Sequence, residues 1–229
     1  MTEVRGRMID FKSNSHIIPG YLVEPADELD HPGLVIIQEW WGLVPHIKDV
    51  AERLGHEGFV VLAPDLYHGK ASEEPDEARK LAMALDRDRA VSEIEAAARH
   101  VIARGEVRPK KVGVVGWCMG GGLALSTAAS SPLFGACVSF YGRPLSESDT
   151  ARIACPVLGL YGENDHGIPV AAVREFEAAL QKTRVAHGVH IYPGAGHAFF
   201  NDSRPEAYNP AAAADAWSRT ISWFRIHLI

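Results

Sequence analysis

The sequence predicts an α/β fold in which helices cover both faces of a mostly parallel, twisted β-sheet, as in an α/β/α sandwich. Short apolar runs rich in β-branched residues recur without polar alternation, which is typical of strands buried on both faces. Helical patterns separate these runs, and this alternation is typical of a doubly wound sheet. The length of 229 residues suits one such unit, so we expect a single domain over residues 1–229.

The expected elements begin with an antiparallel hairpin at the sheet edge, formed by the first 25 residues with Pro19 and Gly20 as turn signals. Six apolar runs of strand length follow, at residues 33–38, 59–63, 111–116, 135–140, 157–161 and 187–192. Helical patterns occupy residues 44–57, 73–104, 119–130, 170–182 and 210–226, and the second is expected to break near Asp86. Ligands of such sheets bind at the carboxyl ends of the strands, so the loops after the strands are the places to search.

The composition excludes several classes of function. Apolar residues make up 47% of the chain and charged residues 23%, which is ordinary for a globular protein. The formal net charge of −6 and the lack of a basic run argue against a nucleic-acid partner. No apolar stretch suits a signal peptide or a membrane span, and the three cysteines lack metal-type spacing. We therefore expect a cytoplasmic monomer or small homo-oligomer with no membrane partner.

A cysteine stands among glycines where one apolar run ends, in the stretch Gly116-Trp117-Cys118-Met119-Gly120. This is the G-x-S-x-G turn of serine hydrolases with sulfur in place of oxygen, and its glycines let strand and helix pack closely around a strained nucleophile. The helix N-terminus favours the thiolate form of Cys118, and the Met119 N–H is a candidate donor to the oxyanion of an attacked carbonyl. The alternative is a buried structural cysteine without chemistry.

An acid and a histidine follow further along the chain, in the order that such a turn requires. Asp165 follows one later apolar run and His197 follows the next. His197 is expected to act as general base and then general acid, while Asp165 fixes its tautomer and supports the imidazolium. Asp165 could instead cap the helix that begins near Pro169. The rivals for these two roles are Glu163, His166 and His68.

The loop after the first of the six apolar runs reads Gln38-Glu39-Trp40-Trp41-Gly42. In a hydrolase with such a turn this loop supplies a second oxyanion donor, and the Trp40 N–H is the candidate. Glu39 ends a buried run, where a carboxylate is costly without a partner, so it is expected to bind the Cys118 thiol or to pair with a loop arginine. Trp40 and Trp41 suit the wall of a site for a flat, partly apolar substrate, and their alternative is a place in the core.

Together these stretches resemble the dienelactone hydrolases, or carboxymethylenebutenolidases, a branch of the α/β-hydrolase fold. The resemblance covers almost the whole chain, and its most specific part is the combination of the turn cysteine with Glu39. The stretches that carry it are Gln38-Glu39-Trp40-Trp41-Gly42, Ala63-Pro64-Asp65-Leu66-Tyr67, Gly116-Trp117-Cys118-Met119-Gly120-Gly121, Gly162-Glu163-Asn164-Asp165 and Gly196-His197-Ala198-Phe199.

The resemblance implies a triad of Cys118, His197 and Asp165 that opens an ester or lactone through an acyl-thioester intermediate. It further implies that Glu39 holds the thiol and takes its proton when substrate binds. No cofactor is implied, and because the sequence has no H-E-x-x-H motif no metal site is expected.

The best-known substrate of the family is a dienelactone, whose carboxylate well-studied members hold with arginines, one shortly after the catalytic histidine and one in the helical segment before the turn. The arginine after the histidine is here Arg204, later than in those members, and Arg79 and Arg143 are alternatives. The other residues expected to line the pocket are Trp41, Tyr67, Tyr141 and Phe199.

The predicted function is hydrolysis of a small activated ester or lactone by a cysteine nucleophile. One alternative is a broad carboxylesterase, thioesterase or small peptidase on the same fold. An alternative of another class is a redox-sensing or ligand-binding module whose Cys118 is oxidised rather than acylated.

Overall fold

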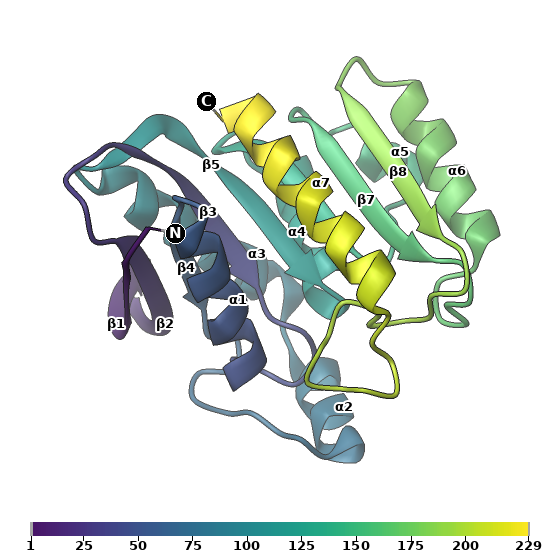
Figure 1. Cartoon of the computed structure of the whole chain (residues 1–229), viewed down its shortest axis with the longest axis horizontal. Helices are drawn as coiled ribbons and strands as arrows, with labels where there is room; N and C mark the ends of the chain where they lie inside the picture. Colours follow the sequence, from purple (N-terminus) through teal and green to yellow (C-terminus); the bar gives the residue numbers. More distant parts are fainter. Residues whose placement is uncertain (1, 229) are drawn as a thin grey trace.

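The computed structural model describes residues 2–228. An eight-stranded sheet runs through the middle of the molecule in the order β1-β2-β4-β3-β5-β6-β7-β8 (Figure 1). Its strands are β1 (Val4–Ser13), β2 (His16–Pro25), β3 (His31–Ile37), β4 (Val60–Pro64), β5 (Val107–Trp117), β6 (Phe134–Phe140), β7 (Val157–Gly162) and β8 (His187–Tyr192). The strands β3 to β8 pair in parallel, whereas β2 is antiparallel to both of its neighbours. The predicted, mostly parallel sheet is confirmed.

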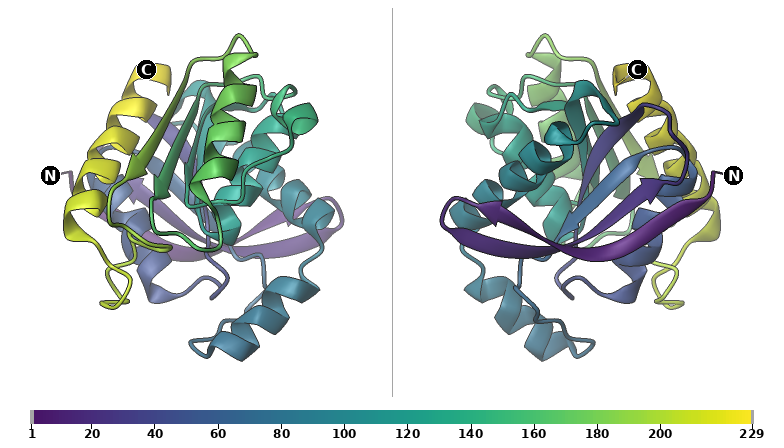
Figure 2. Two further views of the ribbon diagram at one scale, coloured as in Figure 1. Left: turned by 90° about the vertical axis from the view of Figure 1, so that its right-hand side faces the viewer. Right: turned by 90° about the vertical axis from the view of Figure 1, so that its left-hand side faces the viewer.

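Helices cover both faces of this sheet (Figures 1 and 2). Their bounds are α1 (Pro45–His56), α2 (Pro75–Ala84), α3 (Arg87–Ala103), α4 (Met119–Ser130), α5 (Glu147–Thr150), α6 (Val170–Gln181) and α7 (Pro210–Leu228). The helices α1 and α7 pack on one face, and α3, α4 and α6 pack on the other. The predicted break at Asp86 is confirmed, since its carboxylate caps α3 by accepting the Arg89 N–H. Within residues 2–228, no helix is both long and apolar enough to cross a bilayer.

The N-terminal hairpin is present, but its turn was predicted at the wrong residues. The chain reverses at Asn14, where φ is 53°, a value that asparagine tolerates better than most residues. Pro19 and Gly20 lie inside β2 instead. A Cβ on Gly20 would lie 3.0 Å from the Ala63 carbonyl oxygen, so this glycine permits close packing of β2 against β4. Figure 2 shows the long, twisted hairpin at the edge of the sheet.

The central strands explain why the sequence shows continuous apolar runs. Every residue of β4 and of β7 is buried, because helices cover the sheet from both sides. One apolar cluster lies under α3, α4 and α6, and a second lies under α1 and α7. Parallel strands end at the same edge, so the loops after β3, β5, β7 and β8 meet at the lower edge of the sheet in Figure 1.

Candidate active site

The turn between β5 and α4 holds Cys118 in a strained backbone conformation. Its φ is 56° and its ψ is −118°, a combination that non-glycine residues rarely adopt. Such strain costs about 1–3 kcal/mol and persists where the surrounding structure fixes it. Here the Cys118 N–H donates to the Phe140 carbonyl at 3.0 Å, and the Cys118 carbonyl accepts the Gly121 N–H at 3.0 Å. The backbone on both sides of the cysteine is therefore held in place.

Two glycines make this turn possible, as the sequence predicted. A Cβ on Gly116 would lie 2.1 Å from the Gly120 carbonyl oxygen. A Cβ on Gly120 would lie 2.4 Å from the carbonyl oxygens of Gln38 and Ile37. The start of α4 thus packs directly against the ends of β3 and β5, which leaves no room for a side chain at either position.

The loops after β5, β7 and β8 bring together Cys118, Asp165 and His197. The Cys118 Sγ lies 3.2 Å from His197 Nε2, and His197 Nδ1 lies 2.6 Å from Asp165 Oδ2. The other oxygen of Asp165 accepts the N–H groups of Gly167 and Ile168, at 2.9 and 3.0 Å. Asp165 therefore holds the imidazole and also stabilises the turn at Gly167 and Ile168, but it does not cap α6, whose N-cap is Pro169 without a side-chain hydrogen bond.

The surroundings of His197 favour its protonated form. Burial by itself lowers the pKa of an imidazole, but here the hydrogen bonds to Asp165 and Cys118, together with the negative charges of both groups, outweigh it and raise the pKa of His197 to about 10. The Tyr141 ring packs edge-on against the imidazole, with ring centroids 5.1 Å apart. The imidazole is thus held between the Asp165 carboxylate and the Cys118 sulfur.

The rival residues lie elsewhere. Glu163 is exposed and accepts the Gly194 N–H at 3.0 Å, and His166 is exposed as well. His68 pairs with the buried carboxylate of Glu93 at 3.0 Å. Within residues 2–228, none of the three rivals is hydrogen-bonded to Cys118.

Glu39 is buried as expected, with 1% of its surface exposed, but its partners differ from the two that the sequence suggested. Its Oε2 accepts the Asn201 Nδ2–H at 2.6 Å, and its Oε1 accepts the Tyr141 hydroxyl at 3.2 Å. Within the described residues, neither the Cys118 thiol nor an arginine is paired with this carboxylate. Burial raises the pKa of Glu39, against the influence of His46, of the two hydrogen-bond donors and of His197.

The two candidate oxyanion donors stand at the ends of neighbouring strands. Met119 is the first residue of α4, and Trp40 follows the end of β3. Within the part of the chain that the structure describes, neither main-chain N–H donates to another residue; Trp40 lines the cavity beside Cys118, whereas Met119 does not. Tyr67 connects the two residues, because its hydroxyl lies 3.1 Å from the Trp40 carbonyl oxygen and 3.4 Å from Met119 Sδ.

A cavity of about 320 Å³ opens beside the sulfur. It is lined by Glu39, Trp40, Trp41, Cys118, His197, Ala198, Arg204, Glu206 and Ala207. The Arg204 guanidinium lies over the Trp41 ring, 3.7 Å from its centroid, and is 3.4 Å from the Glu206 carboxylate. The two tryptophan rings meet edge to face at 4.8 Å. Sulfur, imidazole, indole and guanidinium groups therefore share one small space.

Several residues predicted for the pocket do not line this cavity. Arg79 points to solvent from α2 and pairs with Asp76 at 3.7 Å, because its helix projects away from the sheet (Figure 1). Phe199 is fully buried in the apolar cluster, where its ring packs against Tyr141 and Tyr192 at centroid distances of 5.3 and 5.1 Å. Tyr67, Tyr141 and Arg143 also lie outside the lining. Tyr67 and Tyr141 nevertheless contact residues that line the cavity, because their hydroxyl groups donate to the Trp40 carbonyl oxygen and to Glu39 Oε1.

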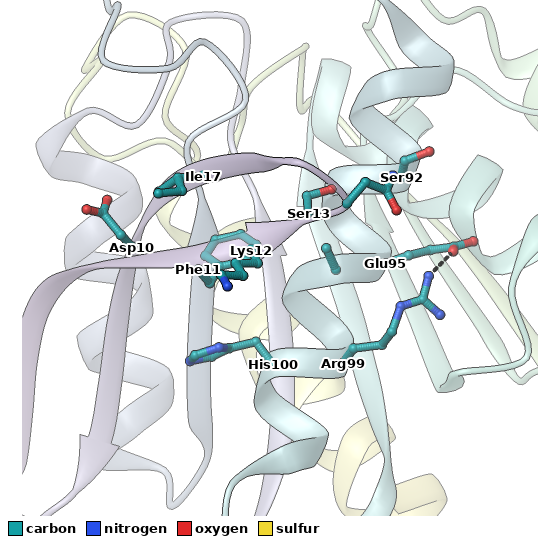
Figure 3. Close-up of a pocket in the computed structure, with 11 residues that line it drawn as sticks. Asp10, Phe11, Lys12, Ser13, Ile17, Ser92, Glu95, Arg99 and His100 are labelled. Atoms are coloured by element: carbon teal, nitrogen blue, oxygen red, sulfur yellow. Dashed lines mark hydrogen bonds and ion pairs between the residues drawn. The ribbon is translucent and has the colours of Figure 1, made fainter.

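Within residues 2–228, two further hollows are lined by none of Cys118, Asp165 and His197. One of about 680 Å³ lies between the β1–β2 hairpin and α3 (Figure 3). Its side chains are mixed polar and apolar groups such as Lys12, Phe11 and His100, and its Arg99 pairs with Glu95 at 2.8 Å. No group of three or more metal-ligating side chains occurs among residues 2–228.

Comparison with known proteins shows the family and the fold of the chain. The model of the dienelactone hydrolase family matches residues 18–228. The chain belongs to the dienelactone hydrolase family. It is accordingly a hydrolase, and its predicted α/β-hydrolase fold is confirmed, since the superposition on solved members is close across nearly all of the chain.

Individual members of the dienelactone hydrolase family match nearly the whole chain. Protein usf from Aquifex pyrophilus is 36% identical over 97% of this chain and 99% of its own. A Bradyrhizobium protein named "Probable 2-oxo-3-(5-oxofuran-2-ylidene)propanoate lactonase" is 32% identical over 96% of this chain and 94% of its own. A crystal structure from Klebsiella pneumoniae, assigned to the dienelactone hydrolases, superposes with a TM-score of 0.90 at 26% identity, covering 97% of this chain and 99% of the other.

The sequence did not identify Asn201 as part of this dienelactone hydrolase family site, nor the lining residues Ala198, Glu206 and Ala207. Asn201 lies in the loop between β8 and α7, and its role depends on a contact with Glu39 across 162 positions. The available signal was the buried, unexplained Glu39, which required a polar partner of some kind. The sequence does not specify which of the polar residues in the later loops would supply it.

Proposed function

We propose that this family member opens a small activated ester or lactone, with Cys118 as the nucleophile and a thioester as the intermediate. The observation that carries the proposal is the chain of contacts from Asp165 through His197 to Cys118, at 2.6 and 3.2 Å, beside a cavity of about 320 Å³. Nucleophile, base and orienting acid in hydrogen-bond reach are the arrangement that nucleophilic catalysis requires.

The proposed reaction proceeds in two halves. The thiolate of Cys118 attacks the carbonyl carbon, and the oxyanion that forms accepts the N–H groups of Met119 and Trp40. When the tetrahedral intermediate collapses, the carbon–oxygen bond of the ester breaks and the leaving alkoxide takes a proton from His197. Water then attacks the thioester while His197 removes its proton, and the carbon–sulfur bond breaks to restore the thiolate.

The cavity favours a flat substrate with an acidic group. The Trp40 indole suits contact with a conjugated ring, and the Arg204 guanidinium, which lies over the Trp41 ring, can bind a carboxylate. The Bradyrhizobium relative is named for a lactone that bears a propanoate, which combines these two features. We therefore propose a carboxylate-bearing, unsaturated lactone or a similar activated ester as the substrate class.

The proposal is tested by looking for the thioester. The protein is mixed with p-nitrophenyl acetate, the first turnover is followed by stopped flow, and quenched samples are digested for mass spectrometry. We expect a burst of nitrophenol and an acetyl group on Cys118, with turnover lost in Cys118→Ala. Cys155→Ala is the matched control, because Cys155 is buried away from the cavity and should leave the burst intact. Turnover at the original rate in Cys118→Ala, or acetylation elsewhere during the burst, would refute the proposal.

A further inference from the structure

Another hollow, of about 520 Å³, adjoins the cavity of about 320 Å³ beside Cys118. Three residues, Trp41, Arg204 and Glu206, line both spaces. Side chains that line two hollows lie between them, so these three residues form a partition. The rest of the second hollow belongs to the start of α1, the segment before α2 and the loop between β8 and α7, with Val44, His46, Ser72, Asn201 and Ser203 among its lining. This loop lies at the lower edge of the sheet in Figure 1.

The walls of the second hollow are held by contacts that do not involve the Arg204 side chain. The Ser72 N–H donates to the Trp41 carbonyl at 3.0 Å, which ties the segment before α2 to the loop after β3. Asp202 pairs with His46 at 3.1 Å, which ties the loop between β8 and α7 to α1. The hollow should therefore persist when the Arg204 side chain is shortened.

The side chain of Arg204 is the movable part of the partition. Its main chain is fixed, because its N–H donates to the Asn201 carbonyl at 3.1 Å and its carbonyl accepts the Tyr208 N–H at 3.0 Å. Its guanidinium lies 3.7 Å from the centroid of the Trp41 ring and 3.4 Å from the Glu206 carboxylate. The Glu206 side chain is 68% exposed, so this ion pair holds the guanidinium weakly. The stack on the buried Trp41 ring is thus the main contact that keeps the partition closed.

We propose that Arg204, stacked on Trp41, closes the catalytic cavity towards the second hollow and thereby limits the enzyme to short acyl groups. Stacking uses the face of the guanidinium and leaves the N–H groups at its edge, so the same residue can still bind a carboxylate. Without the guanidinium the two hollows join, and a longer acyl chain can enter the second one. This inference rests on the proposed function, because it concerns the acyl group that is transferred to Cys118.

The proposed reaction determines which part of the substrate meets the partition. The leaving alkoxide takes its proton from His197 and therefore lies against the imidazole. The acyl group is left with the remainder of the cavity, which ends at Trp41 and Arg204. The length of the acyl chain is accordingly the property that Arg204 limits.

The second hollow suits an uncharged alkyl chain. The Trp41, Val44 and Pro45 side chains give it an apolar side, against which methylene groups can be buried. The carboxylates of Glu73, Glu74 and Glu206 also line it, and they would repel a chain that ends in a second acidic group. The class of substrate admitted by opening the partition is therefore the ester of an unbranched monocarboxylic acid.

The test compares acyl chains of different length. Values of kcat/KM are measured for p-nitrophenyl acetate and p-nitrophenyl octanoate with the native protein, Arg204→Ala and Arg79→Ala. We expect the octanoate-to-acetate ratio to rise about tenfold or more in Arg204→Ala, since each methylene that becomes buried contributes up to about fourfold. Arg79→Ala is the matched control and should keep the native ratio, because Arg79 is an exposed arginine outside both hollows.

Two further variants separate the opening of a space from the loss of a charge. Val44 lines the second hollow but not the catalytic cavity. In an Arg204→Ala background, Val44→Trp should return the ratio to its native value, because the indole fills the space that the chain would enter. Arg204→Lys keeps the charge but lacks the flat group that stacks on Trp41, so its ratio should lie between those of the native protein and Arg204→Ala.

A binding measurement gives the same comparison without turnover. The p-nitroanilides of the same two acids are titrated into each protein, and quenching of tryptophan fluorescence gives their Kd values. The relative affinity for the octanoic anilide should rise about tenfold or more in Arg204→Ala and return to the native value with Val44→Trp.

The outcomes distinguish this inference from the proposed function. Unchanged octanoate-to-acetate ratios in Arg204→Ala would overturn the partition, and so would a gain that survives Val44→Trp. Failure of the proposed function is a different result, namely turnover that persists in Cys118→Ala, and the anilide affinities decide the partition in that case as well.

Discussion

Asp165 Oδ2 lies 2.6 Å from His197 Nδ1, although 32 positions separate the two residues. Asp165 is 3% exposed and its other oxygen is held by two main-chain N–H groups, so the carboxylate has one orientation. The imidazole must therefore donate from Nδ1, which leaves Nε2 to face the Cys118 sulfur. The end of β7 thus determines the orientation of a histidine that belongs to the loop after β8.

Replacing Asp165 by asparagine should lower kcat by about 10³–10⁴-fold, because the amide favours the wrong tautomer of the imidazole. The Oδ1 contacts to Gly167 and Ile168 can remain, so the fold should be retained by circular dichroism. Glu163→Gln serves as the control, since Glu163 is exposed and reaches the Gly194 N–H instead of His197. Steady-state kinetics with a p-nitrophenyl ester give kcat for both variants. A large loss of kcat in Glu163→Gln would mean that Glu163, and not Asp165, is the acid that orients His197.

Arg204→Gln should weaken the binding of acidic substrates more than that of neutral ones. Loss of a charge-assisted hydrogen bond should raise KM for a carboxylate-bearing lactone about 10- to 100-fold, while a neutral ester changes little. Arg79→Gln is the matched control, because Arg79 lies outside the cavity. Equal effects of Arg204→Gln on acidic and neutral substrates would argue against recognition of a carboxylate by this residue.

Gly116→Ala should destabilise the protein, because the new methyl group would lie 2.1 Å from the Gly120 carbonyl oxygen. Overpacking of this kind costs about 1–3 kcal/mol, and backbone atoms cannot move aside as a side chain can. Gly105→Ala is the control, since a Cβ there meets nothing within 4 Å. Urea unfolding compares the stability of the two variants. Equal midpoints would mean that the backbone at Gly116 and Gly120 can move apart without loss of stability.

The ion pair at His197 should make stability depend on pH in a defined direction. The pKa of His197 is raised from 6.5 to about 10, since the bonds to Asp165 and Cys118 outweigh burial. A raised pKa contributes stability in full below about 6.5 and loses it as the pH rises towards about 10. The difference in the free energy of unfolding between native protein and His197→Gln should shrink over that interval. A difference that grows with pH, measured by denaturant unfolding, would contradict this assignment.

The sequence predicted most of the fold because its strands are covered on both faces. Burial of whole strands such as β4 and β7 leaves continuous apolar runs that are easy to recognise. The turn of the hairpin was misplaced because Pro19 and Gly20 are common in turns, whereas here Gly20 serves close packing within β2. The four-residue helix α5 was missed because it is too short to show a helical period.

Part of the site could be predicted from the sequence for a different reason. Residues that follow parallel strands must meet at one edge, so Cys118, Asp165 and His197 could be placed together from their order alone. Side-chain direction in the loops could not be inferred in this way. Phe199 lies in the core although it follows the loop histidine by two positions, and the contact of Glu39 with Asn201 depends on how two distant loops pack.

The order of the loops along the chain has a consequence for biosynthesis. The sulfur at position 118 is made long before the imidazole at position 197, and the last parallel strand must join the sheet before the two can meet. A nascent chain that has not yet reached β8 therefore carries Cys118 without its contact to His197. Under the proposed function, the contact that would activate Cys118 forms only when the C-terminal third has docked on the sheet.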